Sequence, residues 1–277
     1  MDLSEIRSRG LVLLGCGKMG SAMLEGWLAQ GLPPGAFTVL DPKPGPRLIE
    51  LAAEGLHLNE DPPADPAIAI IAVKPQMMGD ALPRLAPLGN GKTIFLSIAA
   101  GTPIAAFEAA FGARTPVIRA MPNTPAAVGR GITALIGNAE VTEEALELAE
   151  TLLRAVGQTV RLENEAQMDA VTAVSGSGPA YVFLLIEALA AAGEAQGLAP
   201  DLALALARAT VGGAGALAEN SGETPSQLRV NVTSPGGTTA AALEVLMRPE
   251  AGLPALLDEA VGQAAARSRA LAGPPGP

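Results

Sequence analysis

The hexapeptide GCGKMG at residues 15–20 constrains the fold of this chain more than any other feature. The apolar run GLVLL precedes it, and the helix-like segment SAMLEGWLAQG follows it. A G-x-G-x-x-G turn between a strand and a helix is typical of a dinucleotide-binding β-α-β unit. There Gly15 makes the tight turn, Gly17 admits a pyrophosphate and Gly20 lets helix and strand pack closely. We therefore predict a nucleotide site that includes Lys18 and Met19, the alternative being a glycine-tight turn without a ligand.

Strand-like and helix-like segments alternate over the first 162 residues. The strand-like runs lie at 10–14, 37–41, 67–75, 93–101, 116–123, 131–138 and 158–162. The helix-like segments lie at 21–31, 47–55, 76–88, 103–112 and 141–157, the last with Thr142 as its N-cap. Continuously apolar runs such as AIAIIAV fit strands buried on both faces. The pattern predicts an α/β fold with a Rossmann-like, doubly wound, mostly parallel sheet.

The strand signals stop near residue 162. The later segments at 164–174, 178–197, 200–220, 224–230, 238–247 and 252–272 all have helical character. We therefore predict a dinucleotide-binding domain at 1–162 and an all-α domain at 163–277, to which the resemblance described below assigns dimerisation and substrate binding. The last five residues, GPPGP, are expected to fray.

Composition narrows the classes of partner. The net charge of −10 argues against a nucleic-acid-binding surface, which needs basic stripes. A single cysteine, Cys16, excludes an internal disulfide framework and fits a reducing compartment. The N-terminus lacks a signal-peptide pattern, and Glu187 interrupts the most apolar stretch. We predict a cytoplasmic protein with no membrane span.

Asp41 bears on the choice between NAD and NADP. It ends the second strand-like run, 21 residues after Gly20. A carboxylate at this place binds the ribose 2′-hydroxyl of NAD and repels a 2′-phosphate. However, Lys43 and Arg47 are close enough in sequence to favour that phosphate. The sequence leaves the preference open, and the alternative for Asp41 is a turn-forming residue before Pro42.

Three further strand ends carry unusual chemistry. They are AVKP at 72–75, SIAAG at 97–101 and RAMPNTPAAVG at 119–129. Ligands of open α/β sheets bind at the carboxyl ends of strands, so we predict cofactor contacts there. The expected residues are Val73, Lys74, Pro75, Ala99, Met121, Pro122 and Asn123. The alternative for the last motif is a plain rigid turn.

The usual acid/base residue of a dehydrogenase is missing. The only histidine, His57, lies between the second helix and the third strand, and no lysine follows Lys92. No metal site is expected. If the protein is a reductase, its substrate should need little proton donation. An imine fits, because its nitrogen can be protonated in solution before hydride attacks the carbon.

At this point the sequence resembles the pyrroline-5-carboxylate reductases over essentially its whole length. The resemblance rests on GCGKMG, AVKP, RAMPNTPAAVG, DAVTAVSGSGPAY (169–181) and NVTSPGGTTAAALEVL (231–246), in that order. It implies reduction of 1-pyrroline-5-carboxylate to L-proline with NADH or NADPH. It also implies a helical domain that interlocks two chains in a homodimer, often within a larger ring of dimers.

The resemblance also assigns substrate residues. The turn SPGG before a helix leaves amides free at a helix N-terminus, which is a ready anion site. The family uses this loop for the substrate carboxylate, with a threonine hydroxyl, that of Thr239, facing the ring nitrogen. By motif position the loop residues are Ser234, Gly237, Thr238 and Thr239. Asn231 corresponds to an asparagine that reaches the cofactor, and Glu165 to an acid near the substrate amine.

One position departs from the family pattern, and two other readings stay open. Members that prefer NADPH usually end the second strand with small polar residues, where this chain has Asp41. A reductase of the β-hydroxyacid dehydrogenase type would need a lysine in the helical domain, which is absent. A non-catalytic dinucleotide sensor is compatible with the composition, and SPGGTT alone would also suit a helix-capping turn.

Overall fold

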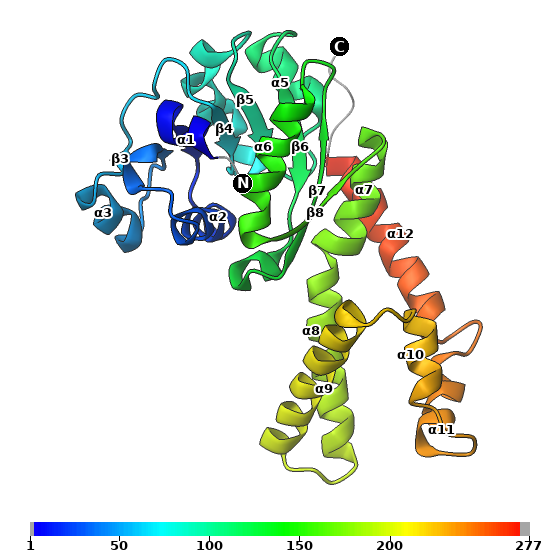
Figure 1. Ribbon diagram of the computed structural model, residues 1–277. Coiled ribbons are helices and arrows are strands. Elements are labelled where there is room, and N and C mark those ends of the chain that lie inside the picture. The colour runs from blue at the N-terminus through cyan, green and yellow to red at the C-terminus, as the bar shows by residue number, and fades with distance from the viewer. Residues whose placement is uncertain (1–2, 272–277) are drawn as a thin grey trace. The chain divides into compact units, whose positions relative to one another are not determined.

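The computed structural model of the protein describes residues 3–271, so the expectation for GPPGP lies outside the described residues. The chain forms two compact units, coloured by residue number in Figure 1. The first unit contains the chain up to Gly176 together with the stretch that starts at Ala265. The second unit is Ser177–Ala264. The strands therefore all belong to the first unit.

The first unit is built on one eight-stranded sheet in the order β3-β2-β1-β4-β5-β6-β7-β8. All neighbouring strands are parallel except β6 and β7. The strands are β1 (Leu11–Leu14), β2 (Phe37–Leu40), β3 (His57–Leu58), β4 (Ile68–Ile71), β5 (Ile94–Ser97), β6 (Val117–Met121), β7 (Gly131–Gly137) and β8 (Gly157–Arg161). The predicted doubly wound, mostly parallel sheet is confirmed. The two-residue strand β3 was not predicted.

Helices cover both faces of this sheet. Side chains alternate along a strand, so Leu11 and Leu13 of β1 pack on one face and Val12 and Leu14 on the other. The first face is covered by α1 (Ser4–Arg9), α2 (Lys18–Ala29), α3 (Pro46–Ala53) and α6 (Glu143–Leu153). The second face is covered by α4 (Met78–Ala81), α5 (Ile104–Phe111) and nearby 3₁₀ turns. Burial on both faces explains why the central strands β1, β4 and β5 are mostly apolar, whereas the edge strands β3 and β8 are partly polar and exposed.

Two local expectations have different outcomes. The hydroxyl of Thr142 accepts a hydrogen bond from the Ala145 amide at 3.3 Å, which confirms the N-cap of α6. The segment 76–88 is not one helix, because only α4 is α-helical among the turns η2 (Pro75–Met77), η3 (Leu82–Arg84) and η4 (Ala86–Leu88). Pro83 and Pro87 lack the amide that a continuous helix requires.

The sheet order fixes the ligand-binding edge. The chain runs from β1 outward to β2 and β3, then returns to the other side of β1 for β4, β5 and β6. The loops after β1 and β4 therefore diverge at a topological switch point, where open α/β sheets bind ligands. The loops after β2, β5 and β6 open at the same edge because these strands are parallel.

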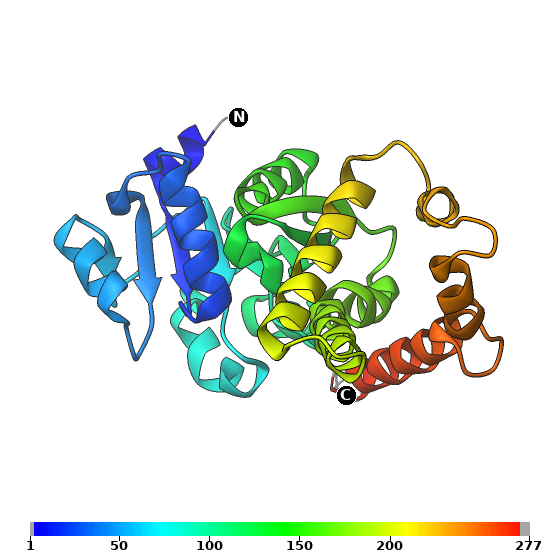
Figure 2. The ribbon, with the colours of Figure 1, turned by 90° about the horizontal axis from the view of Figure 1, so that it is seen from below.

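The second unit is helical, and its own core is small. Helices α8 (Gly178–Ala195) and α9 (Pro200–Asn220) lie side by side (Figures 1 and 2) and bury Ala190, Ala203 and Ala207 between them. Helices α10 (Pro225–Asn231) and α11 (Thr238–Leu246) follow, and α12 (Leu253–Leu271) starts in this unit. Large apolar side chains such as Phe183 and Leu184 are 58% and 64% exposed.

Two helical stretches are long and apolar enough to cross a membrane by length and composition alone. They are Glu165–Ala195 and Pro200–Asn220, and only 11% of each apolar window is buried within the chain. The absence of a membrane span stays a prediction, because length and composition alone do not test it. Core helices of proteins outside membranes pass the same test, so the observation mainly identifies a large uncovered apolar surface.

Candidate active site

The glycine loop after β1 is shaped by packing at two of its glycines. Gly15 has φ +88°, and a Cβ there would lie 2.7 Å from Cγ1 of Val73. A Cβ at Gly20 would lie 2.7 Å from the carbonyl oxygen of Gly15, so α2 can start close against β1 only with glycine. A Cβ at Gly17 would meet nothing within 4 Å. The open space over Gly17 is where a ligand can approach the backbone.

The N-terminus of α2 offers free amides beside this space. The helix starts at Lys18 with Gly17 as N-cap, and no side chain caps it. The first amides of a helix carry partial positive charge and attract phosphate groups. Met19 lies in the same first turn. The residues present therefore fit the pyrophosphate of a dinucleotide.

Asp41 anchors the loop after β2 to the glycine loop. Its Oδ2 accepts a hydrogen bond from the Cys16 amide at 2.7 Å, and its Oδ1 accepts one from the Lys43 amide at 2.8 Å. Asn59 brackets its backbone, with Oδ1 accepting from the Asp41 amide and Nδ2 donating to its carbonyl, both at 2.9 Å. The carboxylate is therefore held in place beside the first turn of the glycine loop.

The other strand ends contribute a second group of predicted residues. Val73 is buried and Lys74 exposed just after β4, where Pro75 starts η2. The Ala99 amide donates to Oγ of Ser97 at 3.2 Å after β5. After β6, which ends at Met121, Pro122 is buried, and Oδ1 of Asn123 accepts from the Ile132 amide at 2.9 Å. The sheet brings these residues to the same edge as the glycine loop.

Glu165 lies in a contact that the sequence analysis did not foresee. Its Oε1 accepts from Nη1 of Arg119 at 2.7 Å and from the Ile104 amide at 2.9 Å. Arg119 is a buried residue of β6. A charged residue within the apolar run PVIRAM was a signal for such a partner, because buried charges are usually paired.

The substrate-loop residues lie in the second unit. Helix α11 starts at Thr238 with Gly237 as N-cap, and no side chain caps it. Gly236 has φ +68°, and the Gly237 amide donates to the Ser234 carbonyl at 3.0 Å, which forms the tight turn. Thr239 lies in the first helical turn and is half-buried. The arrangement leaves amides at the start of α11 for an anion.

Asn231 already has partners in the structure. Its Oδ1 accepts from Nε2 of Gln227 and its Nδ2 donates to Oε2 of Glu223, both at 2.8 Å. Both groups of its amide are therefore engaged within the second unit. Each contact uses one lone pair of Oδ1 or one N–H of Nδ2, so the amide keeps a second acceptor and a second donor.

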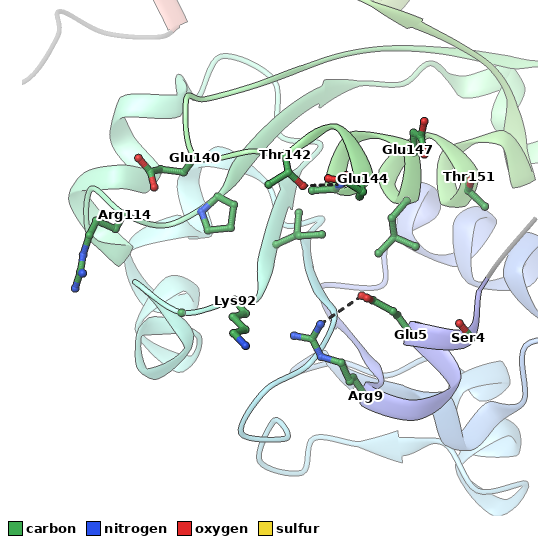
Figure 3. Close-up of a pocket in the computed structure, with 15 residues that line it drawn as sticks. Ser4, Glu5, Arg9, Lys92, Arg114, Glu140, Thr142, Glu144, Glu147 and Thr151 are labelled. Carbon is green, nitrogen blue, oxygen red and sulfur yellow. Dashed lines mark hydrogen bonds and ion pairs between the residues drawn. The ribbon is translucent and has the colours of Figure 1, made fainter.

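A cavity of about 560 Å³ lies at the opposite edge of the sheet (Figure 3). It opens where β5 and β6 begin and where the antiparallel β7 leads into α6. Its lining contains both basic and acidic side chains, and Arg9 and Glu5 form an ion pair there. The basic residues are Arg9, Lys92 and Arg114, and the acidic residues are Glu5, Glu140, Glu144 and Glu147. None of the predicted site residues lines it. Across residues 3–271, no three His, Cys, Asp or Glu side chains gather as a metal site.

The fold and the glycine loop define a Rossmann-type, dinucleotide-dependent oxidoreductase. A family model described as NADP oxidoreductase, coenzyme F420-dependent, matches residues 10–101, and one described as pyrroline-5-carboxylate reductase dimerisation matches residues 165–271. The pyrroline-5-carboxylate reductase of Pseudomonas aeruginosa is 41% identical over 95% of this chain and 96% of its own length. The chain belongs to the pyrroline-5-carboxylate reductase family, which confirms the resemblance seen in the motifs.

Solved structures agree. A pyrroline-5-carboxylate reductase from Coxiella burnetii superposes with a TM-score of 0.89 at 33% identity, covering 96% of this chain and 99% of that one. The pyrroline carboxylate reductase of Plasmodium falciparum, solved with NADP bound, has a TM-score of 0.82 at 28% identity with the same coverage. The likeness therefore extends over both units of the chain.

Proposed function

We propose that the protein reduces 1-pyrroline-5-carboxylate to L-proline with NADH or NADPH. The observation that carries this proposal is the near full-length similarity to pyrroline-5-carboxylate reductases, at up to 41% identity among the relatives described above. The reduced nicotinamide supplies a hydride to the imine carbon. The imine nitrogen carries a proton from solution, so the C=N bond becomes a C–N single bond and an amine without a histidine or lysine donor.

The residues of the first unit are assigned to the cofactor. The loop of Gly15, Gly17, Lys18, Met19 and Gly20 binds the pyrophosphate through its amides. The Asp41 carboxylate accepts a hydrogen bond from the 2′-hydroxyl of the adenosine ribose. The strand-end residues form a ledge for the nicotinamide, and they are Val73, Lys74, Pro75, Ala99, Met121, Pro122 and Asn123. Asn231 of the second unit is assigned to the cofactor as well.

The loop before α11 is assigned to the substrate. Backbone amides of Ser234, Gly237 and Thr238 hold the carboxylate at the positive end of the helix, and the Gly237 amide exchanges its bond to the Ser234 carbonyl for one to the substrate. The Thr239 hydroxyl hydrogen-bonds the ring nitrogen, and Glu165 acts near the substrate amine. Orientation of the imine carbon then provides most of the rate enhancement, because fixing two reactants lowers the barrier by several kcal/mol, roughly 7–11 at best.

The second unit is assigned to self-association. The match to a dimerisation model supports an oligomer, and it gives the exposed apolar faces of α8 and α9 a partner of the same chain. We further propose that the protein forms a homodimer, that dimers assemble into a larger ring, and that the protein is located in the cytoplasm. Nucleic acid and membrane are not among the proposed partners.

The proposal is tested by following absorbance of the reduced nicotinamide with purified protein, 1-pyrroline-5-carboxylate and either NADH or NADPH. We expect absorbance loss that depends on the imine, with proline as the product identified by mass spectrometry. Cofactor binding without turnover would contradict the proposal and favour a dinucleotide sensor. Turnover only with other cyclic imines or with hydroxyacids would replace the substrate but keep the reductase class.

A further inference from the structure

The loop between β2 and α3 and the start of α3 contain an acidic and two basic residues that favour different cofactors. Asp41 favours a ribose with a free 2′-hydroxyl, whereas Lys43 and Arg47 are basic residues that could favour a 2′-phosphate. The cofactor preference depends on whether the Asp41 carboxylate is held in place and on whether Lys43 and Arg47 are free to bind a phosphate.

The negative charge of Asp41 is fixed. Both carboxylate oxygens accept hydrogen bonds from backbone amides, those of Cys16 and Lys43, at 2.7 and 2.8 Å. Each oxygen has a second lone pair, so the anchored carboxylate can still accept from a hydroxyl. It cannot swing away from an incoming phosphate without giving up two charge-assisted hydrogen bonds.

Arg47 is already surrounded by carboxylates. Its Nε lies 2.8 Å from Oε1 of Glu25, and its Nη1 lies 3.3 Å from Oε2 of Glu50 and 3.9 Å from Oε1 of Glu54. Three negative charges and one positive charge leave this cluster with a net charge of −2. Each exposed pair is weak by itself, but a phosphate would have to displace Glu25 and approach an anionic cluster.

The anionic cluster reaches the glycine loop. Burial raises the pKa of the Cys16 thiol, and the carboxylates of Asp41 and Glu25 raise it further despite a hydrogen bond with Ser21. The geometry agrees, because Asp41 contacts the Cys16 amide and Glu25 lines one pocket together with Lys18 and Ser21. Helix α2, which provides Glu25, thus presents an acid near the same loop that holds the pyrophosphate.

Lys43 does not balance this charge. Its amide is bound to Asp41, and its exposed side chain has no ion pair with any residue in the described part of the chain. Asp41, Lys43 and the Arg47 cluster together therefore carry a net charge of −2.

We propose that the protein prefers NADH to NADPH, because Asp41 repels a 2′-phosphate and the ion pair with Glu25 keeps Arg47 from binding that phosphate. The inference concerns the same cofactor site as the proposed function and rests on it. It is tested by titration calorimetry with NAD⁺ and NADP⁺ in the absence of any imine, so that failure of the proposed substrate does not affect the outcome. We expect the wild-type protein to bind NAD⁺ roughly tenfold or more tightly than NADP⁺.

Two variants probe the two parts of the proposal separately. Asp41→Asn removes the charge at nearly constant size, but its NH2 group cannot accept one of the two amide hydrogen bonds from Cys16 and Lys43. The ratio of the two affinities is therefore the readout, because a loosened loop weakens both ligands, and we expect the ratio to move toward NADP⁺ by about tenfold.

Glu25→Gln leaves the glycine loop intact and removes the charge of the nearest of the three carboxylates around Arg47, while Glu50 and Glu54 remain. NADP⁺ affinity should therefore rise while NAD⁺ affinity stays within about twofold. Asp65→Asn is the matched control, because it removes one exposed carboxylate that pairs with Arg9 before β1.

Three results of these titrations would contradict the proposed preference for NADH. A wild-type protein that binds NADP⁺ as tightly as NAD⁺ would overturn the inference. An unchanged ratio in both Asp41→Asn and Glu25→Gln, with thermal unfolding like the wild type, would overturn it too. A large loss of NADP⁺ binding in Lys43→Ala would assign the phosphate to Lys43 instead.

Discussion

Nη1 of Arg119 donates a hydrogen bond to Oε1 of Glu165 at 2.7 Å, and the Arg119 side chain is only 7% exposed. The Ile104 amide donates to the same oxygen at 2.9 Å, so one carboxylate joins β6, the start of α5 and the segment after β8. Removing the charge of Glu165 leaves a buried guanidinium without its counterion. Breaking fully buried pairs costs about 3–5 kcal/mol.

We predict that Glu165→Gln lowers the free energy of unfolding by about 2–3 kcal/mol, since Glu165 itself is partly exposed at 32%. Urea denaturation followed by circular dichroism measures this loss. Glu147→Gln is the control, because Glu147 is exposed on α6 and its change should cost less than about 0.5 kcal/mol. A shifted pH profile of kcat in Glu165→Gln would indicate a catalytic role, whereas an unshifted profile with lower stability would make Glu165 a positioning residue.

Gly15 and Gly17 should respond differently to alanine. Gly17→Ala adds a methyl group where nothing lies within 4 Å, so we expect an unchanged melting temperature but roughly tenfold weaker NAD⁺ binding. Gly15→Ala meets Val73 and forces φ +88° on a residue with a side chain, which costs about 1–2 kcal/mol or more. Thermal unfolding without cofactor and NAD⁺ titration separate the two effects. Normal NAD⁺ affinity in Gly17→Ala would argue against the pyrophosphate assignment.

These contrasts indicate what the sequence could and could not predict. The strand, turn and helix of the glycine loop are local, so their sequence pattern predicted them. The same kind of pattern predicted where later strands occur along the chain. The N-cap Thr142 is local too and was found. The contact between Arg119 and Glu165 joins residues 46 positions apart, and no periodicity reveals it. Likewise, Arg47 looked free in the sequence because its strongest partner, Glu25, lies on a different helix.

We predict that Thr239→Ala lowers kcat while NAD⁺ affinity stays nearly constant. A single hydrogen-bond donor to the reacting group contributes about 1–3 kcal/mol to transition-state stabilisation. Steady-state kinetics and NAD⁺ titration measure the two quantities. The control is Thr233→Ala, because the Thr233 hydroxyl donates to the Arg229 carbonyl at 2.6 Å and has no proposed contact with substrate. A full rate in Thr239→Ala would remove this hydroxyl from the proposed mechanism.

Glu150 should make stability depend on pH. It is only 7% exposed, and two hydrogen bonds from Arg161, each 3.1 Å, lower its pKa below the ordinary value of 4.5. Because the folded pKa is the lower one, the contribution is complete above about pH 4.5 and is lost as the pH falls through the folded value. We expect Glu150→Gln to cost about 1–3 kcal/mol near pH 7 and progressively less below about pH 4.

Urea denaturation of the wild type and of Glu150→Gln at several pH values measures this difference. Glu140→Gln is a suitable control, because Glu140 is an exposed acid of the same first unit. A stability difference that stays constant down to about pH 3 would contradict the electrostatic explanation.

The exposed apolar surface of α8 leads to a prediction about assembly. Leu184 is 64% exposed, and its neighbours Val182, Phe183 and Leu185 are at least 43% exposed. Consecutive helical residues point to different sides, so this surface extends round most of the helix. The residues matched by the dimerisation model include this helix. If a second copy covers this surface, Leu184→Asp buries an unpaired carboxylate at the interface, which costs several kcal/mol. We expect light scattering after size-exclusion chromatography to detect a smaller species than for the wild type.

A matched control distinguishes loss of an interface from general damage. Ile49→Asp places the same charge on an apolar residue that is 59% exposed on α3 of the first unit, and it should leave the mass unchanged. NAD⁺ binding of Leu184→Asp should also persist, because the glycine loop and Asp41 belong to the first unit. An unchanged mass in Leu184→Asp would exclude this surface as the interface. A smaller mass in both variants would mean that added charge, and not its position on α8, disrupts assembly.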